Sequence, residues 1–151
     1  ETLIDTVASL NVPYVLMHMQ GTPQTMQNHP SYDDVCREVL DFLIQKIAFL
    51  KSKGIKDIIV DPGFGFGKTA THNFTLLKNL GLLKIPVLPL LLGVSRKGFI
   101  YRTLGTDAEQ ALNGTTVLNT LGLINGADIL RVHDGKQAAE AIRLTGAIYP
   151  Y

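Results

Sequence analysis

Three short stretches of this chain carry side chains whose types and spacing suit the binding of a small, partly anionic molecule. Residues 61–68 read Asp-Pro-Gly-Phe-Gly-Phe-Gly-Lys, so a carboxylate, two aromatic rings and an ammonium group lie between glycines. Glycine lets the chain turn sharply and pass close to a ligand because it has no Cβ. Ser-Arg-Lys follows at 95–97, and Arg131 and His133 come later. If these cationic side chains lie close together in the folded protein, they require a negative charge nearby. A phosphate ester would supply it.

Each stretch also has a simpler interpretation. Residues 61–68 would serve as a tight turn between a strand and a helix, with a helix-capping role. Arg131 would pair with Asp128 or Asp134 in a local salt bridge. The sequence leaves both alternatives open.

Standard nucleotide and metal motifs do not fit. A phosphate-binding P-loop requires glycine where Pro62 stands, and a dinucleotide fingerprint that starts at Gly63 requires glycine where Lys68 stands. Paired spacing of the H-E-x-x-H kind does not occur among the histidines, which disfavours a zinc site. The histidines are His18, His29, His72 and His133.

The composition indicates one folded domain, residues 1–151, whose partner is a small molecule. Hydrophobic residues make up 46% and charged residues 18% of the 151 residues, and the net charge is +1. This balance predicts no nucleic-acid surface, and no apolar run is long enough for a membrane span. Cys36 is the only cysteine, which predicts a buried thiol and a reducing, cytoplasmic compartment. No signal peptide is visible, and because the chain begins at Glu1 within a helical pattern, we expect a fragment.

Hydrophobic periodicity predicts strands that alternate with helices. Strands are expected at 14–19, 57–60, 87–92 and 128–132, and helices at 1–10, 33–53, 73–80, 108–124 and 136–145. Thr71 or His72 would cap the helix at 73–80, and Gly54 would end the helix at 33–53. Strands that are each followed by a helix require a parallel sheet with helical crossovers.

Two α/β architectures have this order, an open doubly wound sheet and a (β/α)8 TIM barrel. In a barrel, functional groups gather at the carboxyl ends of several strands. Every predicted strand here ends in such groups, namely His18 with Gln20, Asp61, residues 95–97, and Arg131 with His133. This even distribution favours the barrel over a single crevice. A complete barrel has eight βα units and about 250 residues, whereas this chain has only four such parallel units. We therefore interpret the chain as the C-terminal half of a barrel.

Strand geometry gives the later side chains a direction. Alternate residues of a strand share a face, so Arg131 and His133 should aim at one ligand. Gly93, Ser95 and Lys97 share the same parity and would point one way if strand geometry continued that far.

Taken together, these stretches resemble the dihydropteroate synthases, a family of pterin-binding enzymes. The matching motifs are residues 61–68, residues 95–97, Arg-Val-His-Asp at 131–134, Met-His-Met-Gln-Gly-Thr-Pro at 17–23 and Thr-Met-Gln at 25–27. They cover the whole chain in the family's order. Gly98 departs from an expected serine and Gly135 from an expected aliphatic residue, but neither change removes a proposed ligand.

The resemblance implies a cytoplasmic folate-pathway transferase that is a target of sulfonamides. Its reaction joins p-aminobenzoate to 6-hydroxymethyl-7,8-dihydropterin pyrophosphate and releases pyrophosphate. It implies a homodimer, and Mg²⁺ held by a missing N-terminal half and by pyrophosphate, with no metal ligand in this chain. Loop 20–30 corresponds to a mobile loop that closes over the substrates. The fragment alone is expected to be inactive.

Residue roles follow from the same resemblance. Pterin-binding positions are Met17, Asp61, Gly65, Phe66, Gly93 and Lys97. Ser95, Arg96 and Phe66 would line the p-aminobenzoate side, and Arg131 and His133 would hold the departing pyrophosphate. Lys97, Arg131 and His133 are the expected catalytic residues.

Two other functions remain open. One is a methyltransferase domain of the same barrel class that binds methyltetrahydrofolate, against which the Ser-Arg-Lys exit argues. The other is a non-catalytic pterin-binding fragment, because half a barrel has open sheet edges and an incomplete site.

Overall fold

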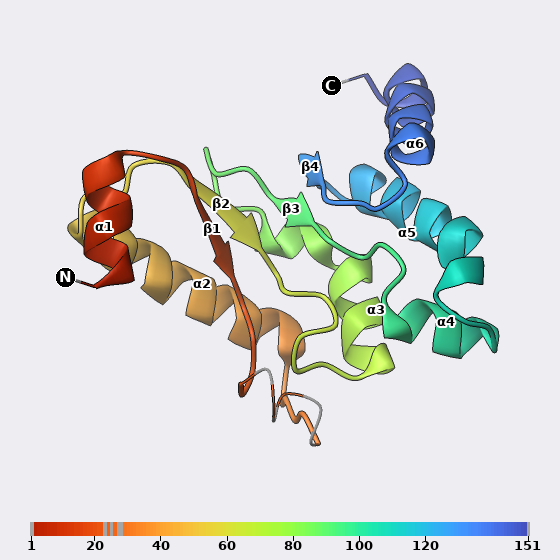
Figure 1. Ribbon diagram of the computed structural model, residues 1–151, viewed down its shortest axis with the longest axis horizontal. Coiled ribbons are helices and arrows are strands. Elements are labelled where there is room, and N and C mark those ends of the chain that lie inside the picture. The colour runs from red at the N-terminus through yellow and green to blue at the C-terminus, as the bar shows by residue number, and fades with distance from the viewer. Residues whose placement is uncertain (1, 23, 25, 27–28, 151) are drawn as a thin grey trace.

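A computed structural model describes residues 2–22, 24, 26 and 29–150 of the chain. Four parallel strands succeed one another in chain order (Figure 1). The pairs β1–β2 and β3–β4 are each hydrogen-bonded, and a parallel bridge between Val60 and Leu90 connects the two pairs. The α/β class with parallel strands is therefore confirmed. The strands are β1 (Tyr14–Met17), β2 (Ile58–Asp61), β3 (Leu91–Leu92) and β4 (Ile129–Leu130).

Helices follow the strands in sequence and lie alongside them. Figure 1 shows α2, α3 and α5 succeeding one another next to the strands, with α6 beside α5. The helices are α1 (Leu3–Leu10), α2 (Val35–Ser52), α3 (Ala70–Lys78), α4 (Gly98–Leu104), α5 (Leu112–Ile124) and α6 (Gly135–Ile148). Two 3-10 turns, η1 (Leu80–Leu83) and η2 (Glu109–Ala111), complete the regular elements among the described residues. No helix within the described ranges is long and apolar enough to cross a bilayer.

The last two strands are shorter than the sequence predicted. The expected strand at 87–92 begins only at Leu91, because Val87 has a φ of 63° and is 94% exposed, so the chain turns there. Pro89 also lacks the N–H that a ladder requires. The expected strand at 128–132 is reduced to Ile129–Leu130, although Arg131 N still donates to Leu92 O at 2.9 Å. The first strand likewise ends at Met17, two residues early.

Two helix predictions were wrong in their boundaries. The helix expected at 73–80 begins at Ala70, because Thr69, and neither Thr71 nor His72, is the N-cap. Thr69 Oγ1 accepts from His72 N and His72 Nδ1 accepts from Thr69 N, which together form a capping box. The helix expected at 108–124 is split into η2 and α5, and α4 was not predicted at all.

The long helix α2 follows its sequence pattern closely. Asp34 caps its N-terminus by accepting from the N–H groups of Cys36 and Arg37. Its buried residues recur at helical spacing and are Val35, Cys36, Val39, Leu43, Ile47 and Leu50. Cys36 is a buried free thiol, as predicted.

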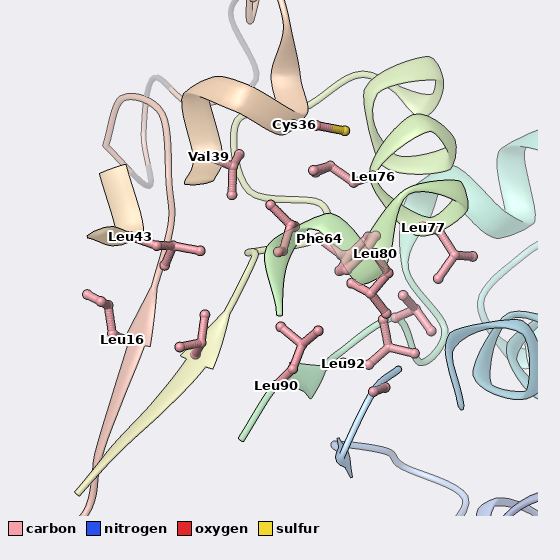
Figure 2. Close-up of a cluster of buried hydrophobic side chains, with 14 of the residues drawn as sticks. Leu16, Cys36, Val39, Leu43, Phe64, Leu76, Leu77, Leu80, Leu90 and Leu92 are labelled. Atoms are coloured by element: carbon pink, nitrogen blue, oxygen red, sulfur yellow. The ribbon is translucent and has the colours of Figure 1, made fainter. Parts of the chain in front are cut away.

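The core lies between the strands and helices α2 and α3. Figure 2 shows Leu16 and Leu90 from the strand side, Leu43 from α2 and Leu76 from α3 pointing into one cluster. Phe64 from the glycine-rich stretch sits in the middle of this cluster and is fully buried. The same stretch therefore contributes both to the core and to the strand ends.

Candidate functional site

Asp61 is the last residue of β2, and its carboxylate lies among several cationic side chains. The residue is 9% exposed, and its Oδ1 accepts from Gly63 N at 2.8 Å. Burial raises the pKa of Asp61, whereas the Gly63 N–H and the charges of Lys97, Lys68 and Arg131 oppose that rise. Tertiary structure thus brings cations from three separate segments close to one carboxylate.

Lys97 lies at the exit of β3, and its charge acts on this carboxylate. Its ammonium lies 4.5 Å from the centroid of the Phe66 ring, a cation–π contact, and donates to Phe64 O. Burial lowers the pKa of Lys97 to about 8, and the nearby Asp61 charge partly offsets this effect. A Cβ on Gly65 would lie 3.1 Å from Lys97 Cδ, so the glycine makes room for the lysine stem.

Ser95 orients His133. The Ser95 hydroxyl oxygen accepts from His133 N at 3.1 Å and lies 2.9 Å from His133 Nδ1. A hydroxyl group can donate one hydrogen bond and accept two, so the contact with Nδ1 holds the imidazole ring whichever partner carries the proton. Because Nδ1 is occupied by Ser95, Nε2 is the ring nitrogen left to contact a ligand.

Arg131 belongs to the same group of charges. Its charge contributes to the pKa shifts of both Asp61 and Lys97. The alternative local salt bridge with Asp128 or Asp134 is wrong for the described residues. Asp128 pairs with Lys84 at 3.0 Å, and Asp134 pairs with a different arginine.

That arginine is Arg96, whose guanidinium makes a two-point contact with Asp134. Nε and Nη2 each donate at 2.8 Å, and Nη1 donates to the carbonyls of Ala108 and Glu109. These contacts raise the pKa of Arg96 and lower the pKa of Asp134. The guanidinium thereby ties together the segments after β3 and β4, and a contact with p-aminobenzoate stays a prediction.

The expected common face of Gly93, Ser95 and Lys97 does not exist, because strand geometry ends at Leu92. Lys97 N donates to Val94 O in a turn, and Arg96 has a φ of 52°. Lys97 nevertheless arrives beside Asp61, by way of this turn.

Other predicted positions lie at the same edge. Met17 is the last residue of β1 and stands in register with Asp61 of β2. Phe66 is partly exposed beside Lys97, and Gly93 is buried just after β3. Of the two rings in residues 61–68, Phe64 turns into the core, whereas a contact between Phe66 and a ligand stays a prediction.

Two residues outside the predicted site prove central to its geometry. Lys68 is 4% exposed and His18 is 6% exposed, and Lys68 Nζ lies 2.9 Å from His18 Nδ1. The sequence signal for Lys68 was present in the near-miss to a P-loop, Gly-Lys-Thr at 67–69.

A pocket of about 250 Å³ adjoins the site between the starts of α3 and α4. Polar and glycine residues dominate its wall. They include Gly65, Lys68, Thr69, Asn73, Gly98 and Arg102.

The loop expected to close over the substrates is only partly described. Gln20 closes its base, because the side-chain amide donates to Ser31 O at 2.9 Å and accepts from Ser31 N at 3.2 Å. The motif positions Pro23, Thr25 and Gln27 lie outside the described residues.

The donor set at these strand ends does not fit a metal ion held by this chain alone. No group of three or more His, Cys, Asp or Glu side chains gathers anywhere in the described part of the chain. Asp61 has cationic neighbours, which suit an anionic ligand better than a cation.

Comparison with known proteins points to one family. Residues 1–133 match the model of the pterin binding enzymes. The dihydropteroate synthase of Escherichia coli strain K12 is 42% identical over 146 residues, which is 95% of this chain and 52% of that protein. The chain thus spans about half the length of the curated relative it matches.

Solved structures of dihydropteroate synthases are also similar to this chain. The Yersinia pestis dihydropteroate synthase, in a sulfonamide drug complex, matches with a TM-score of 0.95 at 37% identity, covering 98% of this chain and 55% of that one. The Thermus thermophilus enzyme in complex with 4-aminobenzoate matches with a TM-score of 0.92 at 36% identity, covering 97% and 61%. Another structure of it contains 6HMPPP.

Proposed function

Because this chain belongs to the pterin-binding enzyme family, we propose that it forms the C-terminal part of a dihydropteroate synthase. The observation that carries this proposal is the carboxylate of Asp61 under the influence of the Lys97 and Arg131 charges at the ends of parallel strands. A carboxylate next to cations suits a substrate with a hydrogen-bond-donating ring at one end and a pyrophosphate at the other.

The finer architecture is the C-terminal half of a (β/α)8 barrel, with residues 1–151 as part of one domain. The strands lie side by side in the order in which they occur in the chain, which supports this. In a barrel this order continues around the sheet, whereas in a doubly wound sheet it reverses at one point. Apolar residues are exposed at both ends of the strand row, including Val15 on β1 and Ile142 on α6. The missing strands and helices would cover these edges.

Each substrate then has a set of residues. Asp61 accepts hydrogen bonds from the aminopyrimidine edge of the pterin, while Met17, Phe66 and Lys97 enclose the ring. The backbone at Gly65 and Gly93 lets the ring approach closely.

The other two groups lie towards the later strands. Arg131 and His133 hold the pyrophosphate, and p-aminobenzoate occupies the side of Phe66 and residues 95–97. Sulfonamides would compete with p-aminobenzoate there.

The reaction needs no protein nucleophile. The bond between the pterin methylene carbon and the pyrophosphate oxygen breaks, and its electron pair leaves with pyrophosphate. The amine nitrogen of p-aminobenzoate forms the new bond to the methylene carbon and gives up one proton to water or to the released pyrophosphate. Arg131 and His133 stabilise the negative charge on the leaving group. Asp61 and Lys97 hold the ring so that its methylene faces the incoming amine.

We expect Mg²⁺ to be held by groups outside this chain together with pyrophosphate, and no step above depends on it. We also expect a cytoplasmic homodimer that binds small molecules and neither nucleic acid nor membrane. Exposed apolar residues of α4 and α5, Leu104, Val117 and Leu121, offer a surface for the second copy. Leu121→Glu should then yield monomers in sedimentation velocity.

The test is incorporation of labelled p-aminobenzoate into dihydropteroate by the full-length protein. Asp61→Asn should lower kcat/KM about a hundredfold or more, whereas Asp57→Asn, at an exposed position before β2, should leave it unchanged. Near-normal turnover by Asp61→Asn would refute the assignment. Methyl transfer from methyltetrahydrofolate in place of this reaction would identify the rival methyltransferase, and turnover by the isolated 151 residues would refute the half-barrel.

A further inference from the structure

Lys68 is buried, and its amino group contacts other groups of the protein. Burial lowers the pKa of Lys68 to about 7, and the nearby Asp61 charge partly offsets this effect. Lys68 Nζ donates to Gly63 O and to Phe66 O, each at 3.0 Å, and lies 2.9 Å from His18 Nδ1. An ammonium group has three N–H donors, so these three acceptors use all of them. Lys68 therefore differs from a P-loop lysine, which directs its charge at a phosphate.

The two carbonyl groups that Lys68 holds lie at the ends of one turn. Phe66 N donates to Gly63 O at 3.1 Å, which closes the turn. Gly63 N in turn donates to the Asp61 carboxylate, and the Phe66 ring lies against the Lys97 ammonium. The amino group of Lys68 thus fixes the backbone between the two side chains that would hold the pterin.

His18 links this turn to the neighbouring strand. Burial, and then the charge of Lys68, lower the pKa of His18 to about 4, so the ring is neutral near pH 7. Its Nδ1 lone pair accepts from the ammonium, and the ring proton sits on Nε2. The ring is fixed edge-on to Phe42, with centroids 4.9 Å apart.

The two strand exits are also in direct backbone contact. A Cβ on Gly63 would overlap the carbonyl of His18, and a Cβ on Gly67 would overlap the backbone of Gln20. Tyr32 adds a third link, because its hydroxyl donates to Gly67 O at 2.8 Å. Loop 61–68 therefore has its shape set from β1 as well as from its own strand.

We propose that Lys68 and His18 form an internal brace that positions the pterin-binding loop 61–68, with Lys68 as a positioning residue. The brace rests on the proposed function for its ligand, but its effect on the loop is independent of any ligand. Loss of the ammonium would free the carbonyls of Gly63 and Phe66 and misdirect Asp61 and Phe66.

The first experiment titrates 6-hydroxymethylpterin into the full-length protein by calorimetry. Lys68→Met should weaken binding about tenfold or more, because hydrogen bonds from a charged donor are lost. Leu76→Ala, a core change in the adjacent helix α3, is the control for loss of stability, and Lys78→Met is the control for loss of charge. Both controls should bind like the unaltered protein. Binding by Lys68→Met like the unaltered protein, or equal weakening in Leu76→Ala, would overturn the brace.

A second pair of variants decides the matter if Lys68→Met does not fold. His18→Asn keeps an acceptor near the Nδ1 position and should retain pterin affinity, whereas His18→Leu should lose it. Equal affinities of these two variants would contradict the proposal.

Hydrogen exchange of the Phe66 amide, measured without ligand, separates this proposal from the proposed function. Exchange should be faster in His18→Leu than in His18→Asn, and faster in Lys68→Met than in Leu76→Ala. Equal rates within both pairs would overturn the brace. Failure of the unaltered protein to bind pterin would refute only the proposed function.

Discussion

Arg96 and Asp134 join the exits of β3 and β4 through two hydrogen bonds of 2.8 Å each. The two residues are 38 positions apart in the chain, and their side chains are about one fifth to one quarter exposed. A planar guanidinium matches a carboxylate in this two-point geometry, which fixes direction as well as distance. The pair therefore holds Ser95 and His133, the neighbours of its two members, in a fixed relation.

Asp134→Asn should lower the thermal midpoint and reduce turnover in the full-length protein, because Arg96 loses its charged partner. The pair depresses the pKa of Asp134, so its stabilisation is present above the ordinary carboxyl pKa of 3.8 and is lost as the pH falls through the lower folded value. Glu140→Gln is the control, since its ion pair with Lys136 is exposed. Equal melting of the two variants at pH 7 would contradict this prediction.

The stability of the protein should rise with pH between about 4 and 6.5 through His18. The folded pKa of about 4 lies below the ordinary 6.5, so the unfolded chain binds more protons in this window. This group contributes at most about 3 kcal/mol to the change. Denaturant unfolding of the unaltered protein and of His18→Asn across this range measures it, and parallel curves would show that His18 does not titrate as expected.

Gly63→Ala should destabilise the protein and weaken pterin binding. Gly63 has a φ of 72°, and an added Cβ would overlap the His18 carbonyl, which is backbone and cannot swing aside. Gly135→Ala is the matched control, because it opens α6 with nothing within 4 Å of the added Cβ. Melting curves of both variants check this, and similar midpoints would be inconsistent with the close contact of the two strand exits.

Substitutions of Phe64 and Phe66 should have different effects, the first on stability and the second on ligand binding. Phe64 is fully buried, so Phe64→Ala should lower the free energy of unfolding by about 3 to 5 kcal/mol. Phe66→Ala should change unfolding much less but weaken the binding of pterin and p-aminobenzoate. Chemical denaturation and calorimetric titration measure the two effects, and the reverse pattern would overturn the assignment.

Lys97→Met should reduce kcat/KM severely while leaving the far-UV circular dichroism spectrum unchanged. In the unaltered enzyme, turnover that depends on the ammonium should decline as the pH rises through about 8, because burial lowers the pKa of Lys97 to that value. Lys56→Met, at an exposed position, serves as the charge control. Normal turnover by Lys97→Met would remove Lys97 from the site.

Much of the fold was readable because local signals agree with it. The apolar stripe of α2, capped by Asp34, and the alternation of strands with helices both follow from short-range periodicity. Helix α4 and the true start of α3 were missed because a polar Ser-Arg-Lys turn and a Thr-His capping box do not show as apolar periodicity. The third strand was expected to begin too early, at Val87, because the sequence does not show that this residue adopts a left-handed conformation.

The sequence by itself determined which groups stand at the strand exits: Asp61, Lys97, Arg131 and His133 each follow an apolar run. Only the tertiary structure decided which neighbours turn inward. Phe64 packs in the core and Phe66 lies against Lys97. Lys68 is buried and contacts His18. The loop carries positive φ values at alternate residues, so strand alternation does not apply, and the partners that choose each direction come from β1 and from the exit of β3. Such contacts join residues far apart in the chain, and no local pattern encodes them.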